Sequence, residues 1–139
     1  MLEVLKYVDL FFPNDREAKK IARTDDLSKA LNLLTGLCQV VVVKRGAASA
    51  ICRAGDEQWS LAPPTVTAVD DVGAGDTFDA GFIHLYLRKS KLEDCLAFAN
   101  IVAAYSVTKA GGTEAFRDRN GLAGFLRHHW TLAGKGSLP

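Results

Sequence analysis

Four consecutive valines, Val40–Val43, constrain the fold more than any other feature of the sequence. A strand with one face in solvent alternates apolar and polar residues, whereas an unbroken apolar run is typical of a strand covered on both faces. A segment with Leu27, Leu31 and Leu34 on one helical face precedes the valines, and Thr24 is its predicted N-cap. The sequence therefore predicts an α/β fold in which a mostly parallel sheet carries helices on both faces.

The remaining elements follow from the same periodicity. Further strands are expected over 7–12, 49–53, 57–61 and 65–69, and further helices over 18–22, 77–90, 91–106 and 120–130. The two strands within 49–61 are predicted to lie antiparallel at the edge of the sheet. The 139 residues are enough for one domain with a core, and Pro63-Pro64 is too short to link two domains. Residues 128–139 are expected to form a loose tail.

Composition and charge exclude several classes of protein. Lys and Arg number 17 against 16 Asp and Glu, and this balance offers no electrostatic attraction to nucleic acid or to an anionic membrane. No apolar run is long enough to span a bilayer. Cys38, Cys52 and Cys95 lie far apart without metal-binding spacing, so we expect buried thiols in a reducing compartment, the cytoplasm.

A glycine-rich loop, Asp70–Asp76, joins the β-branched run at 65–69 to the helix expected after it. The N-terminus of a helix presents unpaired N–H groups and the positive pole of the helix dipole, which together favour an anion. Gly73, Ala74 and Gly75 place no large side chain in front of those groups, and the carboxylate of Asp76 lies in the first turn. An anion cradle beside a base is what phosphoryl transfer to a hydroxyl requires.

Three other interpretations of this loop compete with an anion site. A Walker A loop is excluded because the chain contains no Gly-x-x-x-x-Gly-Lys-Ser/Thr. A dinucleotide fingerprint begins at Gly73 and Gly75, but Phe78 stands where its third glycine belongs. A plain strand-to-helix turn, with glycines for geometry and an acid for the dipole, is the commoner explanation of a short Gly-x-Gly-Asp string.

The longer string Val69–Phe82 reads Val-Asp-Asp-Val-Gly-Ala-Gly-Asp-Thr-Phe-Asp-Ala-Gly-Phe. It resembles the C-terminal signature of the ribokinase-like (PfkB-type) carbohydrate kinases, although Asp71 and Val72 replace the usual pair of threonines. The resemblance implies that the Gly73–Gly75 backbone is an anion hole and that Asp76 deprotonates the sugar hydroxyl. It extends over about 4–127 and covers only the C-terminal half of such a kinase. The expected fold is therefore ribokinase-like and truncated at its N-terminal side.

The resemblance also assigns residues outside the loop. Asn14 and Glu17 match an Asn-x-x-Glu motif that helps to place magnesium and phosphate, although the same spacing is typical of a helix capping box. Lys44 and Gly46 match a Lys-x-Gly that lies beside the nucleotide phosphates, where a polar strand end is the alternative. Asn100 matches a polar residue that faces the adenine, where a solvent-facing amide is the alternative.

A monovalent cation such as K⁺ is implied by the same family. Its ring of ligands would be the Asp70 carboxylate, the Val72 carbonyl and backbone near Ser106, Lys109 and Gly111.

The sequence thus supports ATP- and Mg²⁺-dependent phosphoryl transfer to a sugar hydroxyl as the first hypothesis. A nucleotide-binding or interaction module without turnover is the second, because the half that holds the sugar is not covered. A coenzyme-type kinase of the same superfamily, acting on a hydroxymethyl group, is the third. Expected partners are a nucleotide and a sugar-type small molecule, with self-association through an exposed sheet edge.

Overall fold

The computed structural model describes residues 2–139, which form two compact units. The first unit ends at Leu61 and the second begins at Ala62. The boundary falls one residue before Pro63-Pro64, and whether the chain is one domain stays a prediction.

The first unit contains a four-stranded sheet in the order β1-β2-β3-β4. Its elements are η1 (Val4–Tyr7), β1 (Leu10–Phe11), α1 (Asp15–Ala22), α2 (Leu27–Thr35), β2 (Val40–Val43), β3 (Ala50–Ala54) and β4 (Glu57–Leu61). β1 and β2 pair in parallel with Leu10 opposite Val40, and the pairs β2–β3 and β3–β4 are antiparallel. The α/β class is confirmed, but the sheet of this unit is mixed, because a tight hairpin adds two antiparallel strands.

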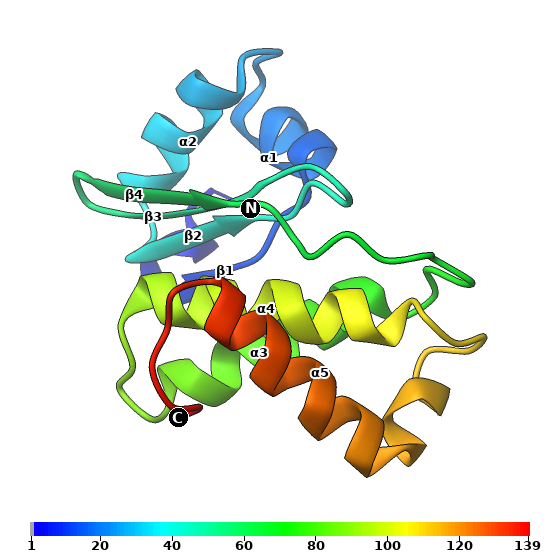
Figure 1. Ribbon diagram of the computed structural model, residues 1–139. Helices are drawn as coiled ribbons and strands as arrows, with labels where there is room; N and C mark the ends of the chain where they lie inside the picture. The colour runs from blue at the N-terminus through cyan, green and yellow to red at the C-terminus, as the bar shows by residue number, and fades with distance from the viewer. Residues whose placement is uncertain (1) are drawn as a thin grey trace. The chain divides into compact units, whose positions relative to one another are not determined.

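The four valines of β2 are all buried, as the unbroken apolar run predicts. Val41 and Val43 belong to a core cluster with Leu31 and Leu34 of α2 and Ala18 of α1. Figure 1 shows α1 and α2 beside each other on one side of this sheet. The alternate valines thus anchor both helices, which places the beginning of α1 next to the end of β2.

Both helices of this unit begin with a side-chain cap. At α1, the Asn14 side chain accepts from the Glu17 N–H and the Glu17 carboxylate accepts from the Asn14 N–H, each at 2.8 Å, which makes a complete capping box. At α2 the cap is Asp26, which accepts from the N–H groups of Ser28 and Lys29. The predicted cap, Thr24, lies two residues too early and accepts from the Asp26 N–H instead.

The second unit is helical: α3 (Ala74–Tyr86), α4 (Leu92–Ser106), η2 (Glu114–Arg117) and α5 (Arg119–Leu132). The strand expected over 65–69 is wrong, because these residues form no strand in the structure. β-branched residues stabilise a strand only where a neighbouring strand pairs with it, and the Val69 N–H donates instead to the Val107 carbonyl at the end of α4, at 2.7 Å. The segment is therefore an extended lead into the glycine-rich loop.

Helices α3 and α4 pack against each other (Figure 1), and Gly81 of α3 lies against Ala99 and Val102 of α4. A Cβ added at Gly81 would collide with a methyl group of Val102 and would lie 3.2 Å from the Ala99 Cα. The small residues at this contact therefore determine how near the two helix axes come. Because α3 carries the glycine-rich loop at its N-terminus, the contact also positions that loop.

Replacing Gly81 by alanine is expected to lower the free energy of unfolding by about 1–3 kcal/mol, because the added methyl group overpacks the α3–α4 contact. Gly124→Ala in α5 is the matched control, since a Cβ there meets nothing within 4 Å. This control should stabilise the chain by up to about 1 kcal/mol, because alanine favours a helix interior. Urea unfolding of the two variants measures both changes, and equal changes would contradict the packing argument.

Part of the segment expected as a loose tail, 128–139, makes defined contacts in the structure. Helix α5 continues to Leu132, and Trp130 is 4% exposed, with its ring edge against Phe98 and its indole N–H donating to the Ser137 carbonyl at 3.2 Å. The Lys135 ammonium group lies 2.7 Å from an Asp94 carboxylate oxygen. A buried tryptophan and an ion pair therefore connect this segment to α4, and its mobility stays a prediction.

Within residues 2–139, every helix is too short or too polar to serve as a membrane span.

Candidate functional site

The glycine-rich loop makes a tight turn directly into α3. Gly73 is the N-cap residue with φ 76° and ψ 0°, a left-handed conformation that favours glycine, and it provides no side-chain cap for the helix. Its carbonyl accepts the first helical hydrogen bond from the Thr77 N–H, at 2.9 Å. The Ala74 N–H donates to the Asp71 carbonyl at 3.2 Å, which closes the turn. The N-terminus of α3 is thus presented by a loop of fixed shape.

The glycine with the left-handed backbone is Gly73, whereas Gly75 belongs to the first turn of α3. A Cβ on Gly73 would lie 3.0 Å from the Gly112 Cα, so a second glycine faces it across the loop. Sequence analysis connected Gly111 with this region but did not predict the approach of Gly112 to Gly73. The paired glycines at 111 and 112, after the end of a helix, were the signal that could have indicated it.

Asp70 joins the two segments that meet here. Its Oδ1 accepts from the Val72 N–H at 3.0 Å within the loop, and its Oδ2 accepts from the Gly111 N–H at 2.8 Å, 41 residues away. The hydrogen bond from Gly111, and after it the one from Val72, holds the pKa of Asp70 below its usual value. The structure therefore brings together Asp70, Val72, Gly73 and Gly111, four of the residues assigned from sequence.

Asp76 lies in the first turn of α3 and is exposed, as is Gly75 before it. This position suits either an acid that stabilises the helix dipole or a base that a substrate can reach. Asn100 lies in α4 and is only 5% exposed. The alternative of a solvent-facing amide is thereby wrong for Asn100, because α4 is buried around most of its circumference.

The predicted residues of the first unit are also close to one another. Asn14 and Lys44 form an isolated parallel bridge, in which the Asp15 N–H donates to the Lys44 carbonyl at 3.2 Å. The start of α1, with its capping box, therefore adjoins the end of β2, which leads to Gly46 at φ 57°. Asn14 and Glu17 are both exposed, and amide and carboxylate oxygens are ligands that Mg²⁺ prefers.

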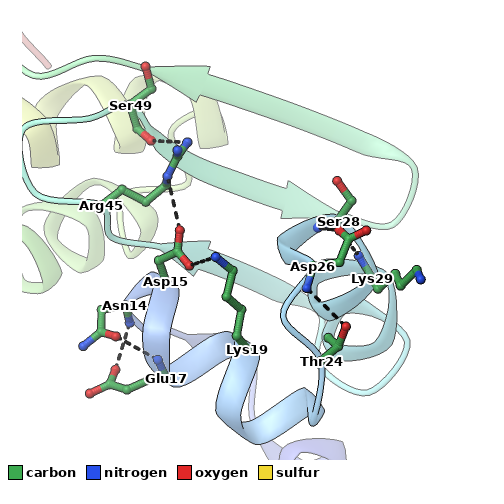
Figure 2. A network of polar contacts seen from close by, with 10 residues as sticks. All are labelled: Asn14, Asp15, Glu17, Lys19, Thr24, Asp26, Ser28, Lys29, Arg45 and Ser49. Atoms are coloured by element: carbon green, nitrogen blue, oxygen red, sulfur yellow. Dashed lines mark hydrogen bonds and ion pairs between the residues drawn. The ribbon is translucent and has the colours of Figure 1, made fainter.

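An ion-pair network that sequence analysis missed surrounds this bridge. Figure 2 shows Asp15 between Lys19, whose ammonium lies 2.6 Å from Oδ1, and Arg45, whose Nε lies 3.7 Å from Oδ2. Arg45 also donates to the Ser49 carbonyl at 3.5 Å. Asp15 thus connects α1 to the Lys44–Gly46 turn. The i,i+4 spacing of Asp15 and Lys19 was the available signal, whereas the Arg45 contact depends on the sheet.

No cluster of three or more His, Cys, Asp or Glu side chains that could hold a metal ion occurs among residues 2–139. Cys38, Cys52 and Cys95 are all buried thiols, as expected, and burial raises the pKa of the Cys95 thiol to about 11.

Comparisons with known proteins identify relatives over most of the chain. The family model described as pfkB family carbohydrate kinase matches residues 1–119. An uncharacterized sugar kinase of Archaeoglobus fulgidus is 32% identical over 114 residues, which are 82% of this chain and 46% of that protein. The chain therefore spans less than half the length of this relative.

Solved structures agree on the fold. The Arabidopsis thaliana ribokinase complexed with ribose and ATP is similar with a TM-score of 0.81 and 27% identity, over 91% of this chain and 43% of that one. An Escherichia coli structure assigned as a ribokinase II, in complex with ATP and Mg²⁺, gives a TM-score of 0.82 and 26% identity. The similarity covers 92% of this chain and 42% of that one. The ribokinase-like fold expected from the sequence is thus confirmed over most of the chain.

Proposed function

Since the chain belongs to the pfkB family of carbohydrate kinases, we propose that it carries the phosphate- and nucleotide-binding part of an enzyme that transfers a phosphoryl group from ATP to a sugar hydroxyl. The observation that carries this proposal is the Gly73 turn, which opens α3 without a side-chain cap and sets Asp76 in its first turn. The ribose and ATP in the Arabidopsis relative support a sugar acceptor and ATP as donor.

In the proposed reaction Asp76 accepts the proton of the sugar hydroxyl as that oxygen attacks the γ-phosphorus. The backbone at Gly73, Ala74 and Gly75 stabilises the charge on the transferring phosphoryl group, because N–H dipoles at a helix start point toward it. The Ala74 N–H already closes the turn onto Asp71, so it has the smallest share in this contact. Mg²⁺ supplies charge neutralisation on the phosphates when bound.

The remaining proposed contacts concern the nucleotide and the ions. Lys44 and Gly46 lie beside the ATP phosphates, Asn14 and Glu17 are on the magnesium side, and Asn100 contributes to the adenine site from its buried position in α4. Asp70 and the Val72 carbonyl are the proposed ligands of a monovalent cation such as K⁺. The oxygen-rich character of this donor set supports hard cations of both kinds.

Replacing Lys44 by alanine is expected to weaken ATP binding about ten-fold while leaving adenosine binding almost unchanged, because only ATP presents the charge that an ammonium group neutralises. Isothermal titration with the two ligands measures the difference. Lys29→Ala removes the same charge from α2 and should leave both affinities unchanged. Equal losses for ATP and adenosine in Lys44→Ala would contradict the assignment.

The direct test of the proposed function is a titration of ATP with and without a panel of sugars, followed by an assay of sugar-dependent ADP formation. Tighter ATP binding in the presence of one sugar, with turnover, would support the kinase. ATP binding without any sugar effect would support the second candidate, a nucleotide-binding module. The same titration therefore decides between the two candidates.

An acceptor with a hydroxymethyl group in place of a sugar belongs in the same panel, since the loop chemistry would serve either alcohol. We also propose that the chain works in the reducing cytoplasm, which its buried thiols support.

Self-association through a sheet edge is a further part of the proposal, and the edge strand β4, whose residues are largely exposed, supports it.

A further inference from the structure

We propose that Asp70 is a positioning residue whose carboxylate fastens the glycine-rich loop to the Gly111–Gly112 turn and thereby holds the start of α3 in its phosphate-binding arrangement. The inference rests on the proposed phosphate site, but it concerns a different action: Asp70 would shape the site through the backbone rather than contact the phosphate. The two hydrogen bonds that Asp70 accepts, from the N–H groups of Val72 and Gly111, together form the Asp70 latch.

The latch uses both carboxylate oxygens on two segments that are far apart in sequence. The Val72 N–H bond at 3.0 Å curls the loop around Asp70, and the Gly111 N–H bond at 2.8 Å draws in the turn that follows α4. Hydrogen bonds to a charged acceptor are stronger than neutral ones, so each bond resists opening of the loop. The Asp70 side chain therefore stabilises the conformation of the loop through Val72 and also holds the loop against the turn at Gly111.

Backbone contacts also hold together the two segments that the latch joins. The N–H groups of Val69 and Asp70 both donate to the Val107 carbonyl, at 2.7 and 3.3 Å, so the residue that carries the carboxylate is itself tied to the end of α4. On the other side, a Cβ on Gly112 would lie 3.3 Å from the Val72 carbonyl oxygen. The two segments thus pack directly against each other, and loosening Gly111 would release the support beneath Gly73.

Electrostatic repulsion and the latch predict opposite effects on ATP binding when the Asp70 carboxylate is removed. A carboxylate near a phosphate site repels the anion, so a neutral residue at this position should strengthen ATP binding if only charge matters. If the latch matters, the same substitution should weaken ATP binding, because the N–H groups at the start of α3 lose their alignment. The sign of the change therefore distinguishes the two effects.

The latch is also distinguishable from a cation ligand. A carboxylate offers about four lone-pair positions, so two N–H donors leave room for a cation on the same group. If Asp70 acts through K⁺, replacing K⁺ by tetramethylammonium in the wild-type chain should reproduce the loss seen in the variant. If Asp70 acts as a latch, the wild-type chain should keep its affinity without K⁺, and the variant should be weakened in both buffers.

The experiment measures ATP and adenosine affinity by calorimetry for the wild-type chain and for Asp70→Ala, Asp70→Asn and Asp71→Asn, in K⁺ and in tetramethylammonium. We expect Asp70→Ala to weaken ATP binding about ten-fold or more, and Asp70→Asn about three-fold because its amide oxygen keeps one acceptor, with little change for adenosine. Asp71→Asn removes the same charge one residue later and should leave ATP binding unchanged or slightly stronger. ATP binding that is unchanged or stronger in Asp70→Ala would overturn the proposal.

A second measurement separates this inference from the proposed function. In ¹H–¹⁵N spectra of the ligand-free chain, the amide signals of Val72 and Gly111 should both move upfield in Asp70→Ala, and the Gly111 signal should stay in place in Asp71→Asn. If these signals respond while the wild-type chain binds no ATP, the latch stands and the phosphate site fails. If Gly111 does not respond in a folded Asp70→Ala chain, the latch is wrong whatever the chain binds.

Discussion

Under the proposed function, replacing Asp76 by asparagine is expected to lower kcat for sugar phosphorylation by about 10²–10⁴-fold, the usual contribution of a general base. The amide keeps the shape of the side chain but cannot accept the hydroxyl proton. ATP affinity should change little, since Asp76 is exposed in the first turn of α3 and its proposed partner is the acceptor sugar. Steady-state kinetics with saturating ATP and sugar measure the effect.

Asp71→Asn is the matched control for this substitution, because it removes one carboxylate from the same loop at a position proposed to have no part in proton transfer. Its kcat should remain within about two-fold of the wild-type value, because a surface charge a few residues away acts only through a screened field. Retained turnover in Asp76→Asn would return Asp76 to the simpler role of an acid that stabilises the helix dipole.

Replacing Gly73 by alanine should have the second-largest effect and should act on stability as well as on binding. A Cβ at φ 76° strains the backbone, and this one would also lie 3.0 Å from the Gly112 Cα. Together we expect a loss of about 2–4 kcal/mol in the free energy of unfolding, from left-handed strain and overpacking. ATP binding should fall as well, because the collision separates the loop from the Gly111–Gly112 turn.

Gly134→Ala is the control that separates the backbone strain of a positive φ from the close contact with Gly112. Gly134 also has a positive φ, 71°, but a Cβ there meets nothing within 4 Å. It should cost about 1–2 kcal/mol, the left-handed penalty alone. Urea unfolding of both variants gives the comparison. If Gly73→Ala is no more destabilising than Gly134→Ala, the approach of Gly112 does not constrain the loop.

Local sequence signals identified those parts of the structure that depend on neighbouring residues. The capping box of Asn14 and Glu17 needs only three-residue spacing, and the hairpin at Gly55 needs only a turn between two strands. The buried β2 followed from its four valines, and the start of α3 from its glycines. For the capping box, the hairpin and the start of α3, the interactions that form the element arise within about a dozen residues, whereas β2 also pairs with β1, 30 residues away.

Tertiary structure decided the conformation of segments whose contacts are made with residues far away in the sequence. The run at 65–69 has the composition of a strand but forms none, because a strand needs a neighbour and the Val69 N–H bonds to the end of α4 instead. The burial of Trp130 against Phe98 of α4 likewise depends on a residue 32 positions earlier in the chain.

The same division applies to the candidate site. The sequence determined that a glycine-rich turn opens a helix beside an aspartate, because turn geometry and helix capping are local. It did not determine which glycine adopts the left-handed backbone, or that Gly112 lies against Gly73 and Asp70 accepts from Gly111. Those contacts join segments about 40 residues apart, and only the packing of α3 against α4 brings them within hydrogen-bonding distance.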